Sequence, residues 1–244
     1  MRATGSKQIH SYRLSIRVQA DGFSLCTQPI GVRARPESEH VPLEPDTRPS
    51  DTLRRALTRL RTASCTYDEV ELLVDTPTTW VPLEEFHRNE MHAIYSLTFP
   101  RQAAVAEDIR YELLPHLEVT AIYSAPHELV DTVRDIYPEM RLHAIQGQLV
   151  QQAAQREQKI RRSGPCMHAD QCGEGVFLYA IKDRQLVFAS TFPCTAGGDG
   201  LYHLLNTWQM LKFDRQTHTC VLHPSFHSIK DKVTQFIKKV ELCE

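Results

Sequence analysis

Possible metal ligands lie close together in one segment of the sequence, CMHADQC at residues 166–172. Its candidate ligands are Cys166, His168, Asp170 and Cys172, and later segments add Cys194, His218, Cys220 and His223. Thiolate, imidazole and carboxylate groups are the ligands that zinc prefers. The two cysteines of the segment, however, are separated by five residues, which matches no common zinc motif. We therefore predict a loop ahead of a strand, and no metal site.

Other catalytic arrangements are not favoured by the residue spacing. The chain has no G-x-S-x-G elbow, no P-loop and no G-x-G-x-x-G segment. Its 12 histidines and 7 cysteines allow many Cys–His pairs, and no single pair is favoured. His218, His223 and His227 flank a short predicted strand, where solvent-facing or buried, hydrogen-bonded positions are expected. We predict no catalytic residues, no cofactor-binding residues and no cofactor.

Composition indicates an ordinary globular protein. The 244 residues are 41% hydrophobic and 24% charged, and the formal net charge is -2, which gives no global attraction for nucleic acid or acidic lipid. The N-terminal segment lacks the apolar stretch of a secretory signal, and the run Val176–Ile181 is too short to cross a membrane. We therefore expect a cytoplasmic protein whose cysteines are reduced and mostly buried.

Two segments of similar design are predicted to form β-hairpins. Gly175–Phe192 consists of two apolar runs joined by a polar turn at 182–185, and Tyr12–Thr27 alternates apolar and polar residues around Asp21-Gly22. Each is followed by helix and strand units. We expect the two hairpins to occupy equivalent places in two sheets, with a boundary at Ser163-Gly164-Pro165.

The remaining pattern alternates strands and helices, which is typical of parallel strands with right-handed crossovers. The predicted strands are 69–74, 79–82, 95–99, 109–114, 117–125, 141–145 and 219–222. The predicted helices are 50–61, 83–92, 126–137, 147–158, 199–212 and 225–240. The first helix carries Arg54, Arg55, Arg59 and Arg61 on one face. Contact with nucleic acid is one interpretation of that face, and we expect a solvated face instead.

This order resembles the actin-like ATPase superfamily, which is built from ribonuclease H-like lobes. The segment VTAIYSAPHELVDTVRDIYPEMRLHAIQGQLVQQAAQ, from residue 119, is similar to the corresponding segment of the FtsA and PilM branch. The motifs TWVPLEEF, LVFASTFP and GDGLYHLLNTWQMLKFD resemble a bacterial family of uncharacterised proteins with that fold. The resemblance implies an α/β protein with two such lobes: residues 1–163, with an inserted β-rich segment around 67–115, and a smaller lobe at 164–244.

The hairpins depart from the pattern that the resemblance implies for ATP-using members. Such members carry an Asp in each hairpin, with a Gly two residues on, to place Mg²⁺ and phosphate. Here the stretch Leu14–Ala20 contains no acid, and the second predicted hairpin has Asp183 but no Gly from Val176 to Ala196. Gly197-Gly198 could contact an anion, although a helix capped by Asp199 explains both glycines as well.

These features predict a non-catalytic cytoplasmic interaction or scaffold protein on a degenerate actin-like fold. We expect a protein partner, weak or absent nucleotide binding, no nucleic acid and no membrane span. One alternative is a divergent nucleotide-binding protein that uses the cleft between its lobes. A further alternative is a metal- or thiol-dependent enzyme around Cys166–Cys172.

Overall fold

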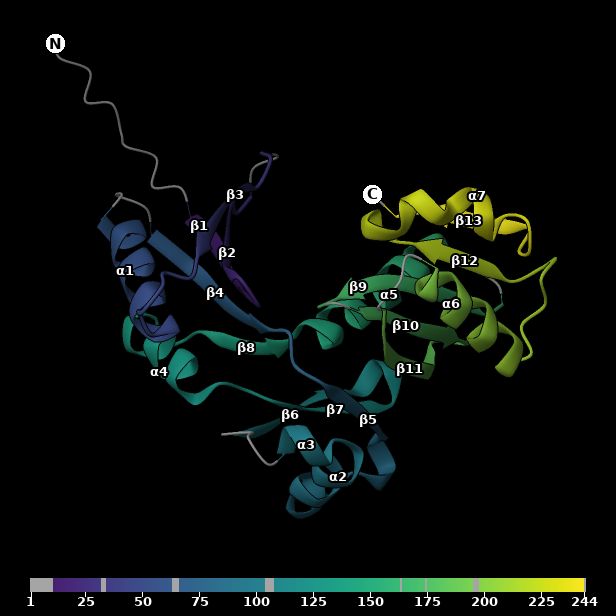
Figure 1. Ribbon diagram of the computed structural model, residues 1–244, viewed down its shortest axis with the longest axis horizontal. Helices are drawn as coiled ribbons and strands as arrows, with labels where there is room; N and C mark the ends of the chain where they lie inside the picture. Colours follow the sequence, from purple (N-terminus) through teal and green to yellow (C-terminus); the bar gives the residue numbers. More distant parts are fainter. Residues whose placement is uncertain are drawn as a thin grey trace, which may run out of the picture. The chain divides into compact units, whose positions relative to one another are not determined.

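A computed structural model describes residues 11–31, 34–62, 66–103, 108–162, 164–173, 175–194 and 198–243 (Figure 1). The chain divides into two compact units. Unit 1 comprises Met1–Asp75 and Ala125–His143, and unit 2 comprises Thr76–Ser124 and Ala144–Glu244. No helix among the described residues is long and apolar enough to cross a membrane.

Unit 1 contains a five-stranded sheet in the order β3-β2-β1-β4-β8. Its strands are β1 (Ser11–Gln19), β2 (Gly22–Pro29), β3 (Glu37–Pro42), β4 (Thr66–Val74) and β8 (Arg141–Ala144). Helices α1 (Pro49–Thr62) and α4 (His127–Ile136) pack against each other. The alternation in β1 buries Leu14 and Ile16, while the helical spacing in α1 buries Leu53 and Leu57. Apart from the edge strand β3, which is not among the predicted strands, these elements agree with the sequence pattern.

Unit 2 contains a second five-stranded sheet in the order β11-β10-β9-β12-β13. Its strands are β9 (Cys166–Cys172), β10 (Gly175–Lys182), β11 (Gln185–Pro193), β12 (Thr219–Leu222) and β13 (Lys239–Leu242). In both sheets the second strand pairs antiparallel with the first and the third, and the fourth strand pairs parallel with the first. One strand order is therefore used twice.

The two predicted hairpins do not occupy equivalent places in these sheets. Tyr12–Thr27 covers the first and second strands of its sheet, whereas Gly175–Phe192 covers the second and third strands. The counterpart of the first hairpin is β9–β10, because the predicted loop at 166–172 is strand β9. The polar composition of residues 166–172 led to the prediction of a loop. The segment nevertheless forms strand β9, which is buried on both faces and whose polar residues contact one another.

The register repeats one detail in both sheets. Gly22, at the start of β2, pairs with Pro42 at the end of β3, and Gly175, at the start of β10, pairs with Pro193 at the end of β11. A Cβ atom on Gly22 would lie 2.2 Å from the Val41 carbonyl oxygen, and one on Gly175 would lie 2.5 Å from that of Phe192. Both glycines therefore permit close approach of the third strand.

A three-stranded sheet in the order β5-β7-β6 forms part of unit 2. Its strands are β5 (Thr78–Pro82), β6 (Ile109–Leu114) and β7 (Val119–Ser124). The helices α2 (Met91–Thr98) and α3 (Pro100–Ala103) lie between β5 and β6 in the sequence. Two predictions were wrong here: the predicted strand 95–99 lies in α2, and the predicted helix 83–92 is mostly two 3-10 turns, η1 (Leu83–Glu85) and η2 (Arg88–Glu90). Tertiary packing explains the first error, because α2 buries Tyr95 against Ile109 and Ile122.

Helices lie on both faces of the second sheet. On one face α6 (Asp199–Met210) and α7 (Lys230–Val233) pack on the apolar side chains of β9, β10 and β12. On the other face α5 (Ile145–Ile160) packs on β9 and β10. The predicted helix 225–240 was wrong: it is the 3-10 helix η4 (Pro224–Ile229), the short α7 and then β13, because that last segment pairs with β12.

The predicted lobe boundary at 163/164 differs from the division of the chain into two compact units. Because α5 packs on β9 and β10, its contacts belong to unit 2, as do those of the three-stranded sheet. Ser163 of the predicted boundary lies outside the described residues.

Candidate functional site

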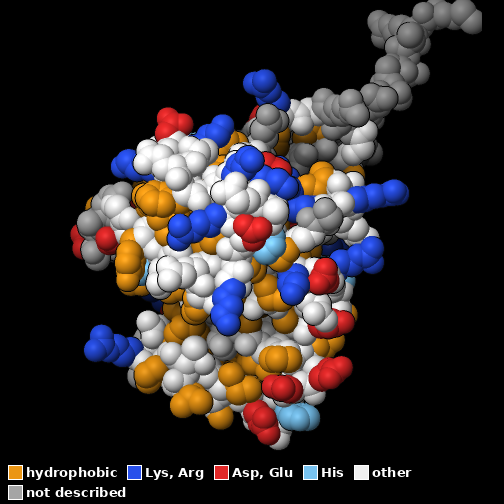
Figure 2. Space-filling view, turned by 90° about the vertical axis from the view of Figure 1, so that its right-hand side faces the viewer, with side chains coloured by type: hydrophobic (Ala, Val, Ile, Leu, Met, Phe, Trp, Pro, Cys, Tyr) orange, Lys and Arg blue, Asp and Glu red, His pale blue; other side chains and the backbone are white. Residues whose placement is uncertain are grey.

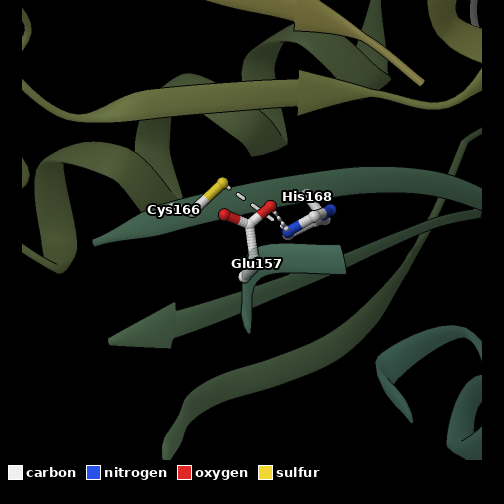
Figure 3. A group of neighbouring side chains, drawn as sticks. All are labelled: Glu157, Cys166 and His168. Carbon is white, nitrogen blue, oxygen red and sulfur yellow. Dashed lines mark hydrogen bonds and ion pairs between the residues drawn. The ribbon is translucent and has the colours of Figure 1, made fainter. Parts of the chain in front are cut away.

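A buried polar cluster lies between α5 and β9 in unit 2. The alternation of β9 places Cys166, His168 and Asp170 on the face that α5 covers, and Met167 and Ala169 on the apolar face. Glu157 of α5 points toward Cys166 and His168 (Figure 3). The exposed fractions of Glu157, Cys166 and His168 are 7%, 1% and 0%. Three groups that can bind a metal ion therefore meet away from solvent.

One ring nitrogen of His168 faces both other members of this cluster. Its Nε2 lies 3.5 Å from Sγ of Cys166 and 3.5 Å from Oε1 of Glu157. The three ligand atoms lie within 4.8 Å of one another. Although Oε1 of Glu157 is buried, it accepts no hydrogen bond of good geometry from any described residue.

The other oxygen of Glu157 contacts Arg162. The Arg162 guanidinium also donates hydrogen bonds of 2.8 and 2.6 Å to the two carboxylate oxygens of Glu241, and one of 3.0 Å to Oγ1 of Thr219. Burial favours the protonated form of Glu157, but His168 and Arg162 outweigh this effect and lower its pKa. The hydrogen bonds to Arg162 lower the pKa of Glu241. Both carboxylates are therefore ionised at neutral pH.

A second histidine continues the cluster on the far side of His168. Nδ1 of His168 lies 3.4 Å from Nε2 of His223, and Nδ1 of His223 lies 3.1 Å from Oδ2 of Asp170. The hydroxyl of Tyr179 lies 3.2 Å from the same Nε2 of His223, and its ring stacks on His168. Burial lowers the pKa of His168, and burial together with His168 lowers the pKa of His223 to about 4. Both imidazoles are neutral at pH 7.

The thiol of Cys166 is not arranged as a nucleophile. Burial raises its pKa, and the carboxylate of Glu157 raises it further. A catalytic cysteine reacts as a thiolate, and a raised pKa disfavours that form.

The structure gathers only some of the ligand candidates found in the sequence. Cys166, His168, Asp170 and His223 belong to the cluster. Cys172 ends β9 beside the turn, and Cys220 packs in the apolar core on the other face of the sheet. The remaining candidates are outside the cluster: Cys194 contacts the carbonyl of Phe192, His218 accepts from the backbone of Asp214, and His227 contacts the carbonyl of Cys243.

Sequence reasoning missed Glu157. The signal was present, because Gln146, Val150, Ala153 and Glu157 follow one another at helical spacing and are all buried. A charged residue on the buried face of an amphipathic helix indicates a buried partner.

A pocket of about 990 Å³ lies beside the cluster in unit 2. Its lining includes Glu157 and Cys166, together with Arg161, Arg162 and Arg184. Arg161 ends α5 in a left-handed conformation, and Arg184 lies in the turn between β10 and β11. The pocket therefore combines the metal-ligating groups with three cationic side chains.

The hairpin that corresponds to β1–β2 differs from the one predicted. Gly173 lies in the turn between β9 and β10, Gly175 begins β10, and Asp170 precedes the turn on β9. The predicted absence of glycine therefore concerned the wrong hairpin.

The prediction that Asp199 caps the following helix was also wrong, because Asp199 is the first residue of α6 and Gly198 holds the N-cap position. Gly197 lies outside the described residues.

The arginine face of α1 is largely occupied by acidic partners. Arg54 pairs with Asp135 at 3.0 Å and Arg55 with Glu44 at 2.7 Å, while Arg59 contacts Glu39. The side chain of Arg61 is not described.

On a face of the molecule that includes unit 2, Lys and Arg side chains are mixed with Asp and Glu side chains (Figure 2).

Comparison with known proteins identifies the family of this chain. Residues 3–240 match the family described as proteins of unknown function, DUF3822. The chain belongs to the DUF3822 family. No curated protein matches it.

Solved structures place this DUF3822 protein in the actin-like ATPase fold. A Bacteroides thetaiotaomicron protein with an actin-like ATPase fold and unknown function is similar, with a TM-score of 0.79, 20% identity, and coverage of 96% of this chain and 91% of that one. The PilM–PilN type IV pilus biogenesis complex matches with a TM-score of 0.52, 10% identity, and coverage of 95% and 88%. At these identities the likeness shows the fold, and the predicted fold class and resemblance are confirmed.

Proposed function

We propose that this DUF3822 protein is a non-catalytic interaction protein that acts in the cytoplasm on an actin-like fold. The observation that supports the proposal is the close packing of the third strand against the start of the second strand in both sheets. Gly22 and Gly175 each lie against the backbone of that third strand. In the first turn, Asp21 pairs with His40 at 3.7 Å, and its carbonyl accepts from the Leu43 N–H.

Catalysis of phosphoryl transfer depends on groups that hold phosphate and metal in position. At Gly22 and Gly175 the third strand takes the space that a phosphate group would need. That PilM forms a complex with PilN supports the interaction class, because it shows that the fold accommodates a protein partner.

Mg–ATP tests the non-catalytic half of the proposal. A ligand at 100 times its dissociation constant stabilises a protein by about 2.7 kcal/mol, which raises the melting temperature by a few degrees at this size. We expect no shift with millimolar Mg–ATP and no release of inorganic phosphate. Phosphate release that is lost in an Asp170→Asn variant would show that the β9–β10 hairpin is catalytic and would overturn the proposal.

Site-specific photo-crosslinking in the native cells tests the interaction half. Suitable positions are the exposed side chains of Leu97, Tyr202 and Met210, with the exposed His92 as the control on α2. We expect one discrete adduct, and the crosslinked protein, once purified, should bind this chain directly. Failure of every position to give an adduct, or of the purified protein to bind, would contradict the proposal.

A second candidate function is binding of a nucleotide or another phosphorylated ligand in the arginine-lined pocket. Arg161 and Arg184 line it without an ion-pair partner among the described residues. This candidate predicts a thermal shift with ATP in the absence of Mg²⁺, no hydrolysis, and loss of the shift in an Arg161→Gln/Arg184→Gln double variant. Arg101→Gln/Arg215→Gln is the matched control on other exposed arginines.

A further inference from the structure

Two of the three separations within the Glu157–Cys166–His168 cluster match those of a zinc site. Zinc binds sulfur at about 2.3 Å, and imidazole nitrogen and carboxylate oxygen at about 2.0–2.2 Å, usually in tetrahedral geometry. Two ligand atoms bound in this way lie about 3.4–3.6 Å apart. Nε2 of His168 is 3.5 Å from both Sγ of Cys166 and Oε1 of Glu157. The third separation, between the sulfur of Cys166 and the carboxylate of Glu157, is within 4.8 Å, so these two side chains must approach each other to complete the geometry.

One oxygen of Glu157 lacks a hydrogen-bond partner in the described part of the chain. Oε1 is buried, accepts no hydrogen bond of good geometry from any described residue, and lies 3.5 Å from Nε2 of His168. A buried carboxylate oxygen costs free energy unless a donor or a cation satisfies it. A metal ion held by Glu157, Cys166 and His168 would satisfy this oxygen.

The surroundings of the cluster resemble those of metal sites. A metal-ligating histidine usually donates its other ring N–H to an acceptor that orients it, and His223, held by Asp170, offers that acceptor to His168. Arg162 holds the second oxygen of Glu157, which leaves Oε1 directed at the cluster. The ligand orientations are therefore set by neighbouring side chains.

We propose that Glu157, Cys166 and His168 bind one zinc ion, with the fourth coordination position directed toward the arginine-lined pocket. Both Glu157 and Cys166 line that pocket, so a water molecule can complete the coordination. Thiolate, imidazole and carboxylate together favour zinc over magnesium or calcium, which prefer oxygen ligands alone. On binding, the thiol of Cys166 becomes a zinc-bound thiolate and its proton leaves to solvent.

This proposal revises the prediction of no metal site. That prediction considered Cys172 as the partner of Cys166, whereas the structure brings Glu157 from a different element. It is independent of the proposed function, since a zinc ion held here is compatible with an interaction protein.

Cobalt spectroscopy tests the proposal on the whole chain. Protein purified without chelator is assayed for zinc, then stripped and titrated with Co²⁺ alone. We expect one equivalent of zinc, a thiolate-to-cobalt charge-transfer band that saturates at one equivalent of Co²⁺, and loss of the band when Zn²⁺ is added. A wild-type protein with no charge-transfer band would overturn the proposal.

Variants locate the site. Cys166→Ser is expected to abolish the charge-transfer band, and Glu157→Gln to weaken Co²⁺ binding at least tenfold. Cys220→Ser is the matched control, because Cys220 is equally buried on the neighbouring strand but faces the apolar core. Circular dichroism verifies that each variant is folded. A band that survives in Cys166→Ser, or that disappears equally in Cys220→Ser, would contradict the assignment.

Discussion

Nε2 of His168 lies 3.5 Å from Oε1 of Glu157, and this contact joins the second sheet to the helix that covers it. The two residues are 0% and 7% exposed. Burial of such groups is costly unless partners satisfy them, and here Arg162 and His223 supply partners on either side.

Loss of Arg162 should destabilise the protein strongly. Its side chain is 12% exposed and pairs with Glu157 and Glu241, so Arg162→Met leaves a buried carboxylate without its cation. We expect a loss of about 3 kcal/mol in the free energy of unfolding, measured by urea denaturation. Arg161→Met, at the exposed neighbouring residue, should change it by less than about 0.5 kcal/mol. Equal effects of the two changes would contradict the interpretation.

The glycines opposite the two prolines should be intolerant of a side chain. In Gly22→Ala and Gly175→Ala the new Cβ would meet a backbone oxygen at 2.2 and 2.5 Å. Because the backbone must shift, we expect each change to cost about 1–3 kcal/mol of stability in chemical denaturation. Gly198→Ala is the control, since no heavy atom lies within 4 Å of its Cβ position. A near-neutral Gly175→Ala would disprove the close approach.

The two faces of α6 should respond differently to truncation. Trp208 is 1% exposed in the apolar core of unit 2, whereas Met210 is 58% exposed. Trp208→Ala is expected to cost about 3–5 kcal/mol because it removes a large buried side chain and leaves a cavity. Met210→Ala should have little effect. Thermal melts of both variants measure the two effects. A larger loss of stability in Met210→Ala than in Trp208→Ala would contradict this orientation of α6.

Low pH should lower the stability of the protein through protonation of Glu241. The hydrogen bonds from Arg162 lower the folded-state pKa of Glu241, so the folded state binds its proton less readily than the unfolded state does. The resulting stabilisation is complete above the ordinary glutamate pKa and is lost as the pH falls through the lowered pKa. Urea denaturation across this pH range measures the effect. The free energy of unfolding should decline less steeply with falling pH in Glu241→Gln than in the wild type. Equal slopes in Glu241→Gln and in the wild type would contradict this role of the ion pair.

The sequence by itself determined the elements whose apolar residues keep a clear period. Helices α1, α4, α5 and α6, the β1–β2 and β10–β11 hairpins, and strands β5, β6, β7 and β12 were predicted close to their observed bounds. The local motifs also led to the correct fold class, which the solved structures confirm. In these segments the alternation or the helical spacing of buried residues is a local property that can be recognised without a partner segment.

Only the tertiary structure decided the elements whose identity depends on a distant partner. Strand β9 appeared as a polar loop because Cys166, His168 and Asp170 are stabilised by residues far away in the sequence, chiefly Glu157 and His223. Strand β13 continued an apparent helical pattern, and its pairing with β12 decided its conformation. The candidate zinc site depends on the same long-range contact, since the spacing of residues along the chain does not reveal which side chain of a covering helix will face a strand.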